Sequence, residues 1–256
     1  MKLVEPPAEQ SEVSLVSLQF SLVIPAYNES QRLPPFLESV RRHVTDRYGD
    51  QYEVLVVDDG STDGTTDCLR RDFGSWPHLR ILTRPRNQGK GAAVRTGMLA
   101  ARGDVVLFAD ADGATPIEEE QRLRDAIRSG ADVAVGSRLR AAAGVTCQRR
   151  WHRAMVGRLF ARFAHWMVPV PVRDTQCGFK MFRREVAQRL FSLSQERRYL
   201  FDLELLALAD RLEYGIAEVP VNWSEIPGSK LSMTREWRPI LAGLARIRRR
   251  LANAET

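Results

Sequence analysis

The chain has 256 residues, of which 44% are hydrophobic, so it can bury one large core or two modest ones. No uninterrupted apolar run approaches the roughly 18 residues of a membrane-spanning helix, and residues 1–14 contain no apolar signal core, so we expect at most peripheral contact with a membrane. The net charge of +6 is moderate, and the three cysteines are odd in number and lack metal-ligand spacing, which favours a reducing cytoplasm.

Strand and helix patterns alternate over the first 136 residues, after an expected loose tail at residues 1–17 that is rich in proline, glutamate and serine. This alternation predicts right-handed βαβ units, and therefore an α/β fold with a mostly parallel sheet flanked by helices. The expected strands are 16–24, 54–57, 79–82, 105–109 and 133–135, and the expected helices are 33–47, 64–73, 91–102 and 117–129.

Beyond residue 136 the alternation stops. The patterns there predict a basic amphipathic helix over 149–167, an ordinary helix over 200–212, an edge strand over 219–223 that contains a proline, and an amphipathic helix over 237–251. The chain has no internal repeat and no low-complexity linker. We therefore expect one domain over 18–233, with halves of about 18–136 and 137–233, and a basic amphipathic C-terminal helix over 234–256.

Carboxylates follow two of the predicted strands. Asp110 and Asp112 come directly after the apolar run 105–109, and Asp58 and Asp59 follow the run 53–57. Two neighbouring carboxylates at the end of a buried strand are costly unless a positive charge lies between them. Parallel sheets bind ligands at the carboxyl ends of their strands, and a hard divalent cation already carrying a diphosphate fits such a pair. The pattern indicates a site for a nucleotide and a metal.

Three loops around these strands carry further candidates, each with a plainer alternative. A base could stack on Tyr27 in the segment 25–29, or the segment could be an ordinary turn. One of Asp58 and Asp59 is expected to face a ribose or base, although the segment 58–64 also reads as a turn with a helix cap. The glycine-rich segment 86–91 opens a helix, as phosphate-binding loops do, yet its spacing fits neither the P-loop nor the dinucleotide fingerprint.

Basic residues are clustered. No acidic residue lies between Asp132 and Asp174, and a second basic cluster occupies 246–250, which points to an anionic partner. In the predicted helix 149–167, aromatic residues interleave with arginines, as in helices that lie in a membrane interface; packing against the core is the alternative. The arginines of the first cluster are Arg138, Arg140, Arg149, Arg150, Arg153, Arg158, Arg162 and Arg173.

Several of these segments, in this order, resemble the motifs of glycosyltransferase family 2, and within it those of the polyprenyl-phosphate sugar transferases. The resemblance covers about residues 19–245, and its last three motifs favour transfer of glucose to dolichyl phosphate over transfer of mannose. The motifs are IPAYNE (24–29), VVDDGSTD (56–63), NQGKG (87–91), DAD (110–112), DTQCGFK (174–180), FDLE (201–204) and VNWSEIPGSK (221–230).

The resemblance implies a GT-A fold, a nucleotide-sugar donor, Mg²⁺ or Mn²⁺, and inversion at the anomeric carbon. It places Asp112 on the metal, with Asp110 beside it and beside the sugar-nucleotide. The donor-binding residues would be Pro25, Tyr27, Glu29, Asp58, Asp59, Lys90 and Asp110.

On the acceptor side we expect basic residues to hold a lipid phosphate, because guanidinium groups suit bidentate phosphate binding. Asp202 and Glu204 are too close in sequence to share a helix face, so we expect them to differ in role. The candidates for acceptor binding are Arg138, Arg173, Gln176, Lys180, Asp202 and Lys230, and the candidates for catalysis are Asp110, Asp112 and Arg138.

The sequence thus predicts a metal-dependent hexosyltransferase at the cytoplasmic face of a membrane, moving glucose, from UDP-glucose, to polyprenyl or dolichyl phosphate. Mannosyl transfer from GDP-mannose and transfer to a soluble acceptor are the alternatives. A nucleotidyltransferase would need a glycine- and arginine-rich loop after the first strand, whereas this chain has the segment Pro-Ala-Tyr-Asn-Glu at 25–29. A nucleic-acid-binding protein would leave both acidic strand ends unexplained, and we expect no nucleic-acid partner.

Overall fold

The computed structural model describes residues 18–140, 142–148, 164–226 and 233–253. The predicted tail at 1–17, the candidate Lys230 and most of the predicted helix 149–167 lie outside the described residues. The end of that helix, residues 164–167, is described and is helical.

Seven of the described strands form one sheet, in the order β3-β2-β1-β4-β7-β5-β8. Strands β1 to β4 are parallel to one another, β7 is antiparallel to both β4 and β5, and β8 is parallel to β5. The strands are β1 (Phe20–Ala26), β2 (Tyr52–Asp58), β3 (Leu79–Thr83), β4 (Val105–Ala109), β5 (Val133–Ser137), β7 (Phe179–Arg183) and β8 (Ile216–Pro220), and the short β6 (Cys147–Gln148) pairs with β9 (Trp223–Ser224).

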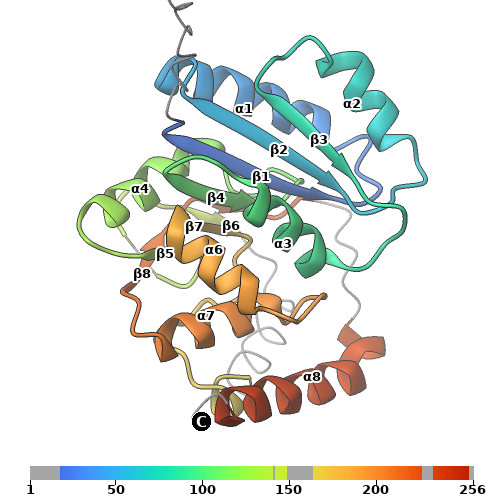
Figure 1. Cartoon of the computed structure of the whole chain (residues 1–256). Coiled ribbons are helices and arrows are strands. Elements are labelled where there is room, and N and C mark those ends of the chain that lie inside the picture. The colour runs from blue at the N-terminus through green and yellow to red at the C-terminus, as the bar shows by residue number, and fades with distance from the viewer. Residues whose placement is uncertain (1–17, 141, 149–163, 227–232, 254–256) are drawn as a thin grey trace, which may run out of the picture.

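Helices cover both faces of the sheet (Figure 1), which explains why every residue of β2 is buried. One apolar cluster joins α1, α2 and α4 to one face, and a second joins α3, α6, α7 and α8 to the other. The helices are α1 (Leu33–Tyr48), α2 (Thr65–Phe73), α3 (Lys90–Ala100), α4 (Glu120–Arg128) after the 3₁₀ turn η1 (Ile117–Glu119), α6 (Arg184–Leu193), α7 (Phe201–Arg211) and α8 (Met233–Asn253).

Up to β5, each predicted strand and helix is confirmed within a few residues, and the predicted α/β fold with a mostly parallel sheet is present. The expectation that alternation stops beyond residue 136 was wrong. Strand β7 and helix α6 follow there, and β7 enters the sheet between β4 and β5 with reversed direction. Strand β8 takes the edge position that its proline predicted.

The C-terminal helix α8 packs on the body of the protein. Leu244 and Ile247 are fully buried in the cluster that α7 also lines, whereas Leu241 on the same helix is exposed. Among the described residues, no helix combines the length and the apolar character needed to cross a membrane.

Candidate active site

The loops after β1 and β2 are fastened to each other at the carboxyl edge of the sheet. The backbone N–H groups of Asn28 and Glu29 donate to the hydroxyls of Ser61 and Thr65, and the Asn28 side chain accepts from the N–H of Thr62. These bonds fix the position of Tyr27 and Glu29 relative to the end of β2.

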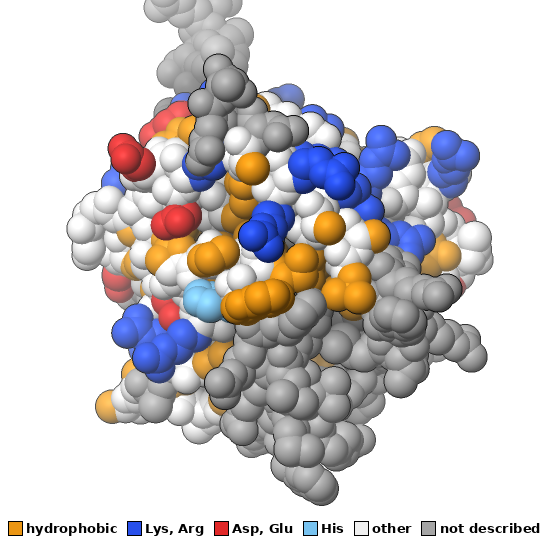
Figure 2. Space-filling view, turned by 90° about the horizontal axis from the view of Figure 1, so that it is seen from below, with side chains coloured by type: hydrophobic (Ala, Val, Ile, Leu, Met, Phe, Trp, Pro, Cys, Tyr) orange, Lys and Arg blue, Asp and Glu red, His pale blue; other side chains and the backbone are white. Residues whose placement is uncertain are grey.

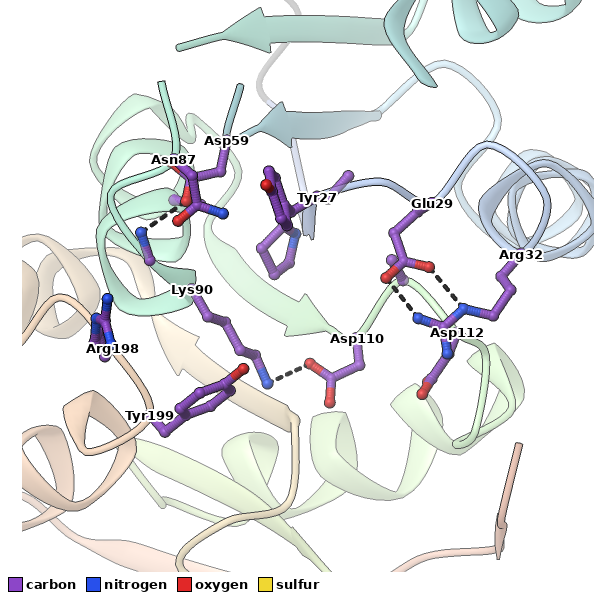
Figure 3. Close-up of a pocket in the computed structure, with 15 residues that line it drawn as sticks. Tyr27, Glu29, Arg32, Asp59, Asn87, Lys90, Asp110, Asp112, Arg198 and Tyr199 are labelled. Carbon is purple, nitrogen blue, oxygen red and sulfur yellow. Dashed lines mark hydrogen bonds and ion pairs between the residues drawn. The ribbon is translucent and has the colours of Figure 1, made fainter. Parts of the chain in front are cut away.

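A cavity of about 380 Å³ opens at this edge. It is bounded by the ends of β1, β2 and β4, by the start of α3 and by the loop between α6 and α7 (Figure 3). Its lining residues are Pro25, Ala26, Tyr27, Glu29, Arg32, Asp59, Asn87, Gly89, Lys90, Ala93, Asp110, Ala111, Asp112, Arg198 and Tyr199. Six of the predicted donor-binding residues therefore meet in one place; the seventh, Asp58, does not line the cavity.

Asp58 and Asp59 have separate roles in the structure. Asp58 is buried and accepts hydrogen bonds from the N–H and hydroxyl of Ser61 and from the hydroxyl of Thr66. Asp59 lines the cavity and accepts from the N–H groups of Gln88 and Gly89. Asp58 therefore shapes its own loop, whereas Asp59 holds the glycine-rich loop beside the cavity.

Lys90, Asp110 and Asp112 form the charged centre of the cavity. Lys90 Nζ lies 2.5 Å from Asp110 Oδ1. Burial lowers the pKa of Lys90, but Asp110 and Asp202 outweigh it and raise the pKa above the ordinary lysine value. Burial and the neighbouring Asp110 raise the pKa of Asp112 above its ordinary value, which marks a carboxylate short of positive charge.

Arg32 supplies a cation that the sequence patterns did not reveal. It directly precedes α1, is paired with Glu29 at 2.6 Å, and leaves its Nη1 buried without a protein hydrogen-bond partner. Arg32 and Asp112 both line this cavity and lie at the same end of it in Figure 3. A buried N–H with no acceptor is costly, so this atom suits a cavity that receives an anionic oxygen.

A second cavity, of about 270 Å³, adjoins the first and shares Lys90, Asp110, Asp112 and Tyr199 with it. Its own walls come from the residues after β4 and β5, from the loop before β7, from α7 and from β9. Its remaining lining residues are Ala114, Thr115, Arg138, Gln176, Gly178, Phe179, Asp202, Trp223, Glu225 and Ile226. The two cavities therefore meet at the Lys90–Asp110–Asp112 centre.

Gly178 explains how the loop before β7 comes so close to this centre. A Cβ on Gly178 would lie 2.1 Å from Asp110 Oδ2, and the carbonyl of Gly178 accepts from the N–H of Asp110 at 3.0 Å. Any side chain at this position would displace the carboxylate that both cavities share.

Arg138 lines the second cavity but already has a protein partner. Its Nε and Nη2 each donate to Asp174 at 2.8 Å, and its guanidinium lies 5.6 Å from the Trp223 ring centroid. Burial raises the pKa of Asp174, but the bonds from Arg138 outweigh it and hold that pKa below the ordinary aspartate value. The pair fixes Arg138 against the cavity wall and leaves little net charge there.

Lys180, Arg173 and Glu204 are not cavity residues. Lys180 is fully buried and lies 2.5 Å from Asp202 Oδ1 while donating to the carbonyl of Cys177, so it holds Asp202 in place from behind. Arg173 is exposed and lines neither cavity. Glu204 accepts three hydrogen bonds from residues 194–196, whereas Asp202 is paired with Lys180, so the two carboxylates have different partners.

The first cavity also contains polar residues that were not among the predicted site residues, namely Arg32, Asn87, Arg198 and Tyr199. Asn87 lies in the glycine-rich segment, whose role at phosphate was expected as a whole. Arg198 and Tyr199 come from the loop before α7, more than 80 residues from the other lining segments, and only the fold brings them there.

The Glycosyl transferase family 2 model matches residues 21–191. The chain belongs to this family. It is 40% identical over 235 residues to a dolichyl-phosphate beta-glucosyltransferase of Drosophila melanogaster, covering 86% of this chain and 72% of that protein. The human protein of the same name is 38% identical over 246 residues, covering 91% and 75%.

Solved structures show that the fold of this family member is of the GT-A type. Glucosyl-3-phosphoglycerate synthase from Mycobacterium tuberculosis in complex with UDP aligns over 90% of this chain and 80% of that chain, with a TM-score of 0.66 and 23% identity. The mannosyltransferase PcManGT from Pyrobaculum calidifontis, in complex with GDP-Man and Mn²⁺, aligns over 87% and 60%, with a TM-score of 0.56 and 20% identity. The chain is a glycosyltransferase.

Proposed function

We propose that this glycosyltransferase moves a glucosyl group, with inversion, from UDP-glucose to polyprenyl or dolichyl phosphate. The observation that carries the proposal is the meeting of two cavities at Lys90, Asp110 and Asp112. The names of the relatives support glucose as the sugar and dolichyl phosphate as the acceptor.

The first cavity is the proposed donor site. Tyr27 and Asp59 would contact the base and ribose, with Pro25 and Glu29 in the same wall, and Lys90 and Arg32 would face the diphosphate. A cavity of about 380 Å³ is within the range of small-molecule sites. The orphaned Nη1 of Arg32 supports an anionic group at this end of the cavity.

Asp112 and Asp110 fit Mg²⁺ or Mn²⁺. No group of three or more His, Cys, Asp or Glu side chains that could hold a metal occurs in the part of the chain that the structure describes. Oxygens of the diphosphate and water would complete the coordination, as hard cations prefer. A bound cation would neutralise the charge that grows on the leaving nucleoside diphosphate.

The second cavity is the proposed acceptor site. A phosphate monoester is mostly a dianion near neutral pH, because its second pKa is about 6, so it can attack the anomeric carbon without a protein base. Arg138 and Gln176 would orient this phosphate. Inversion would require the phosphate to attack the anomeric carbon from the side opposite the leaving diphosphate, and the second cavity is the proposed route for that approach.

The decisive experiment is a transfer assay with the purified chain, Mg²⁺ and a short polyprenyl phosphate in detergent. Radiolabelled UDP-glucose and GDP-mannose are offered in parallel, and the organic phase is counted. Label entering that phase from UDP-glucose alone is the expected result. Label from GDP-mannose alone would overturn the sugar, and bound donor without any lipid product would overturn the lipid acceptor in favour of a soluble one.

We further propose that the enzyme binds the cytoplasmic face of an anionic membrane. Support comes from Trp166, which is 74% exposed, and from Arg248 and Arg249, which are exposed on α8. Figure 2 shows hydrophobic and basic side chains together on the face that α8 crosses. Rings at the acyl boundary and arginines on lipid phosphates are typical of interfacial binding.

The triple variant Trp166→Ser/Arg248→Gln/Arg249→Gln should bind anionic vesicles at least about thirtyfold more weakly, because each basic residue near such a surface contributes about 1 kcal/mol. Co-sedimentation with phosphatidylserine-containing vesicles measures this. The control is Arg128→Gln, whose side chain is 63% exposed on α4. Equal sedimentation of the triple variant and the wild type would refute the assignment of this face.

A further inference from the structure

The loop between α6 and α7, residues 194–200, forms one wall of the proposed donor cavity through Arg198 and Tyr199. This wall is in close contact with the start of α3, because the N–H of Ala92 donates to the carbonyl of Arg197 at 3.0 Å. A Cβ on Gly89 would lie 2.4 Å from that carbonyl oxygen, and one on Gly91 would lie 2.7 Å from the carbonyl oxygen of Glu196. The loop therefore sits against the backbone that carries Lys90.

Helix α8 holds this loop from the opposite side. Arg246 Nε and Nη2 lie 3.1 and 3.2 Å from the two carboxylate oxygens of Glu196. Arg250 Nη1 lies 3.0 Å from Glu204 Oε1 and 3.7 Å from Glu196 Oε1. Leu200 packs against Gly243, where a Cβ would lie 2.3 Å from Leu200 Cδ1.

The contact between the loop and α8 depends on two buried carboxylates, those of Glu196 and Glu204. Glu196 and Glu204 are only 8% and 3% exposed, so each needs a counter-charge in place of the water it has lost. Oε2 of Glu204 accepts hydrogen bonds from the N–H groups of Gln195 and Glu196 and from the Ser194 hydroxyl, and these bonds shape the loop. The two carboxylate oxygens of Glu196 instead accept from Nε and Nη2 of Arg246, and this joins the loop to α8.

We propose that Arg246 is a positioning residue for donor binding: through Glu196 it holds the loop that places Arg198 and Tyr199 at the donor. The inference rests on the assignment of the first cavity as the donor site. Neither Arg246 nor Glu196 lines that cavity; both line an adjoining hollow between the loop and α8, which shares only Arg198 and Tyr199 with the first cavity. Their effect on the donor must therefore pass through the loop.

The test is calorimetric titration of the full chain with UDP-glucose and Mg²⁺, using the wild type, Glu196→Gln, Arg246→Gln and the double variant. Coupling between linked sites is commonly worth fivefold or more, so each single variant should bind the donor at least about fivefold more weakly. The double variant should bind UDP-glucose no more weakly than the single variant of lower affinity, because both changes break the same Arg246–Glu196 ion pair. Arg246→Lys should bind with intermediate affinity, since it keeps the charge and loses the bidentate geometry.

The matched control is the ion pair between Arg41 and Glu38 on α1, which is 2.9 Å long and lines neither cavity. The variants Arg41→Gln and Glu38→Gln should bind the donor with the same affinity as the wild type. The inference fails if the Glu196 and Arg246 variants match the wild type, if their effects add in the double variant, or if the control variants lose affinity equally. Binding of neither UDP-glucose nor GDP-mannose by the wild type would instead overturn the proposed function, and the inference with it.

Discussion

Replacing Asp112 with asparagine should reduce glucosyl transfer by at least about a thousandfold, which corresponds to about 4 kcal/mol of lost transition-state stabilisation. Asp112 belongs to both cavities, and its neighbour Asp110 is already paired with Lys90. Asp112 is therefore the carboxylate with a charge left for a cation. The neutral amide keeps the shape of the side chain and removes most of its affinity for Mg²⁺ or Mn²⁺.

Two measurements separate this effect from unfolding. The Tm of Asp112→Asn should equal or exceed that of the wild type, because the change relieves repulsion between two neighbouring carboxylates. Binding of Mn²⁺ in the presence of UDP should be lost. The control is Asp125→Asn on α4, whose carboxylate is 61% exposed and whose variant should retain full activity. Near-normal transfer by Asp112→Asn would place the metal elsewhere.

The first cavity, the proposed donor site, was predictable as a meeting place of residues because most of them stand at the ends of apolar strands. Strands β2 and β4 read as almost continuous apolar runs, and parallel strands bring their carboxyl ends to one edge, so Asp59 and Asp110 had to meet. The division of roles between Asp58 and Asp59 was not predictable. It depends on which of the two carboxylates accepts hydrogen bonds from the N–H and hydroxyl of Ser61, and in the structure that carboxylate is Asp58.

The second cavity, the proposed acceptor site, was harder to predict because a charged residue obscures the sequence pattern of β7, the strand beside it. β7 reads Phe-Lys-Met-Phe-Arg, and a lysine at its second position argues against a strand covered on both faces. Lys180 is tolerated there only because Asp202, from α7, neutralises it inside the protein. A pairing between residues 22 positions apart on a strand and a helix leaves no periodic signal. The same holds for Arg32, Arg198 and Tyr199, which reach the donor cavity only through the fold.

Replacing Lys180 with methionine should lower the free energy of unfolding by about 3–5 kcal/mol, because it leaves the Asp202 carboxylate buried without its counter-charge. Lys180 is fully buried, Asp202 is 3% exposed, and Nζ of Lys180 also satisfies the carbonyl of Cys177. Chemical denaturation followed by circular dichroism measures the loss. The control is Arg128→Gln on α4, whose side chain is 63% exposed and whose ion pair with Asp125 is 3.9 Å long. That variant should lose less than about 1 kcal/mol.

The double variant Lys180→Met/Asp202→Asn identifies the cause. If the loss comes from an unpaired buried charge, removing that charge should recover a large part of the stability, and the double variant should be more stable than Lys180→Met alone. If the loss comes from packing around β7, the double variant should be no better. Because Asp202 lines the acceptor cavity, the rescued double variant also tests its role there. If stability is restored while transfer stays impaired, the ion pair has two functions: it stabilises β7 against α7, and it positions the Asp202 carboxylate in the proposed acceptor cavity.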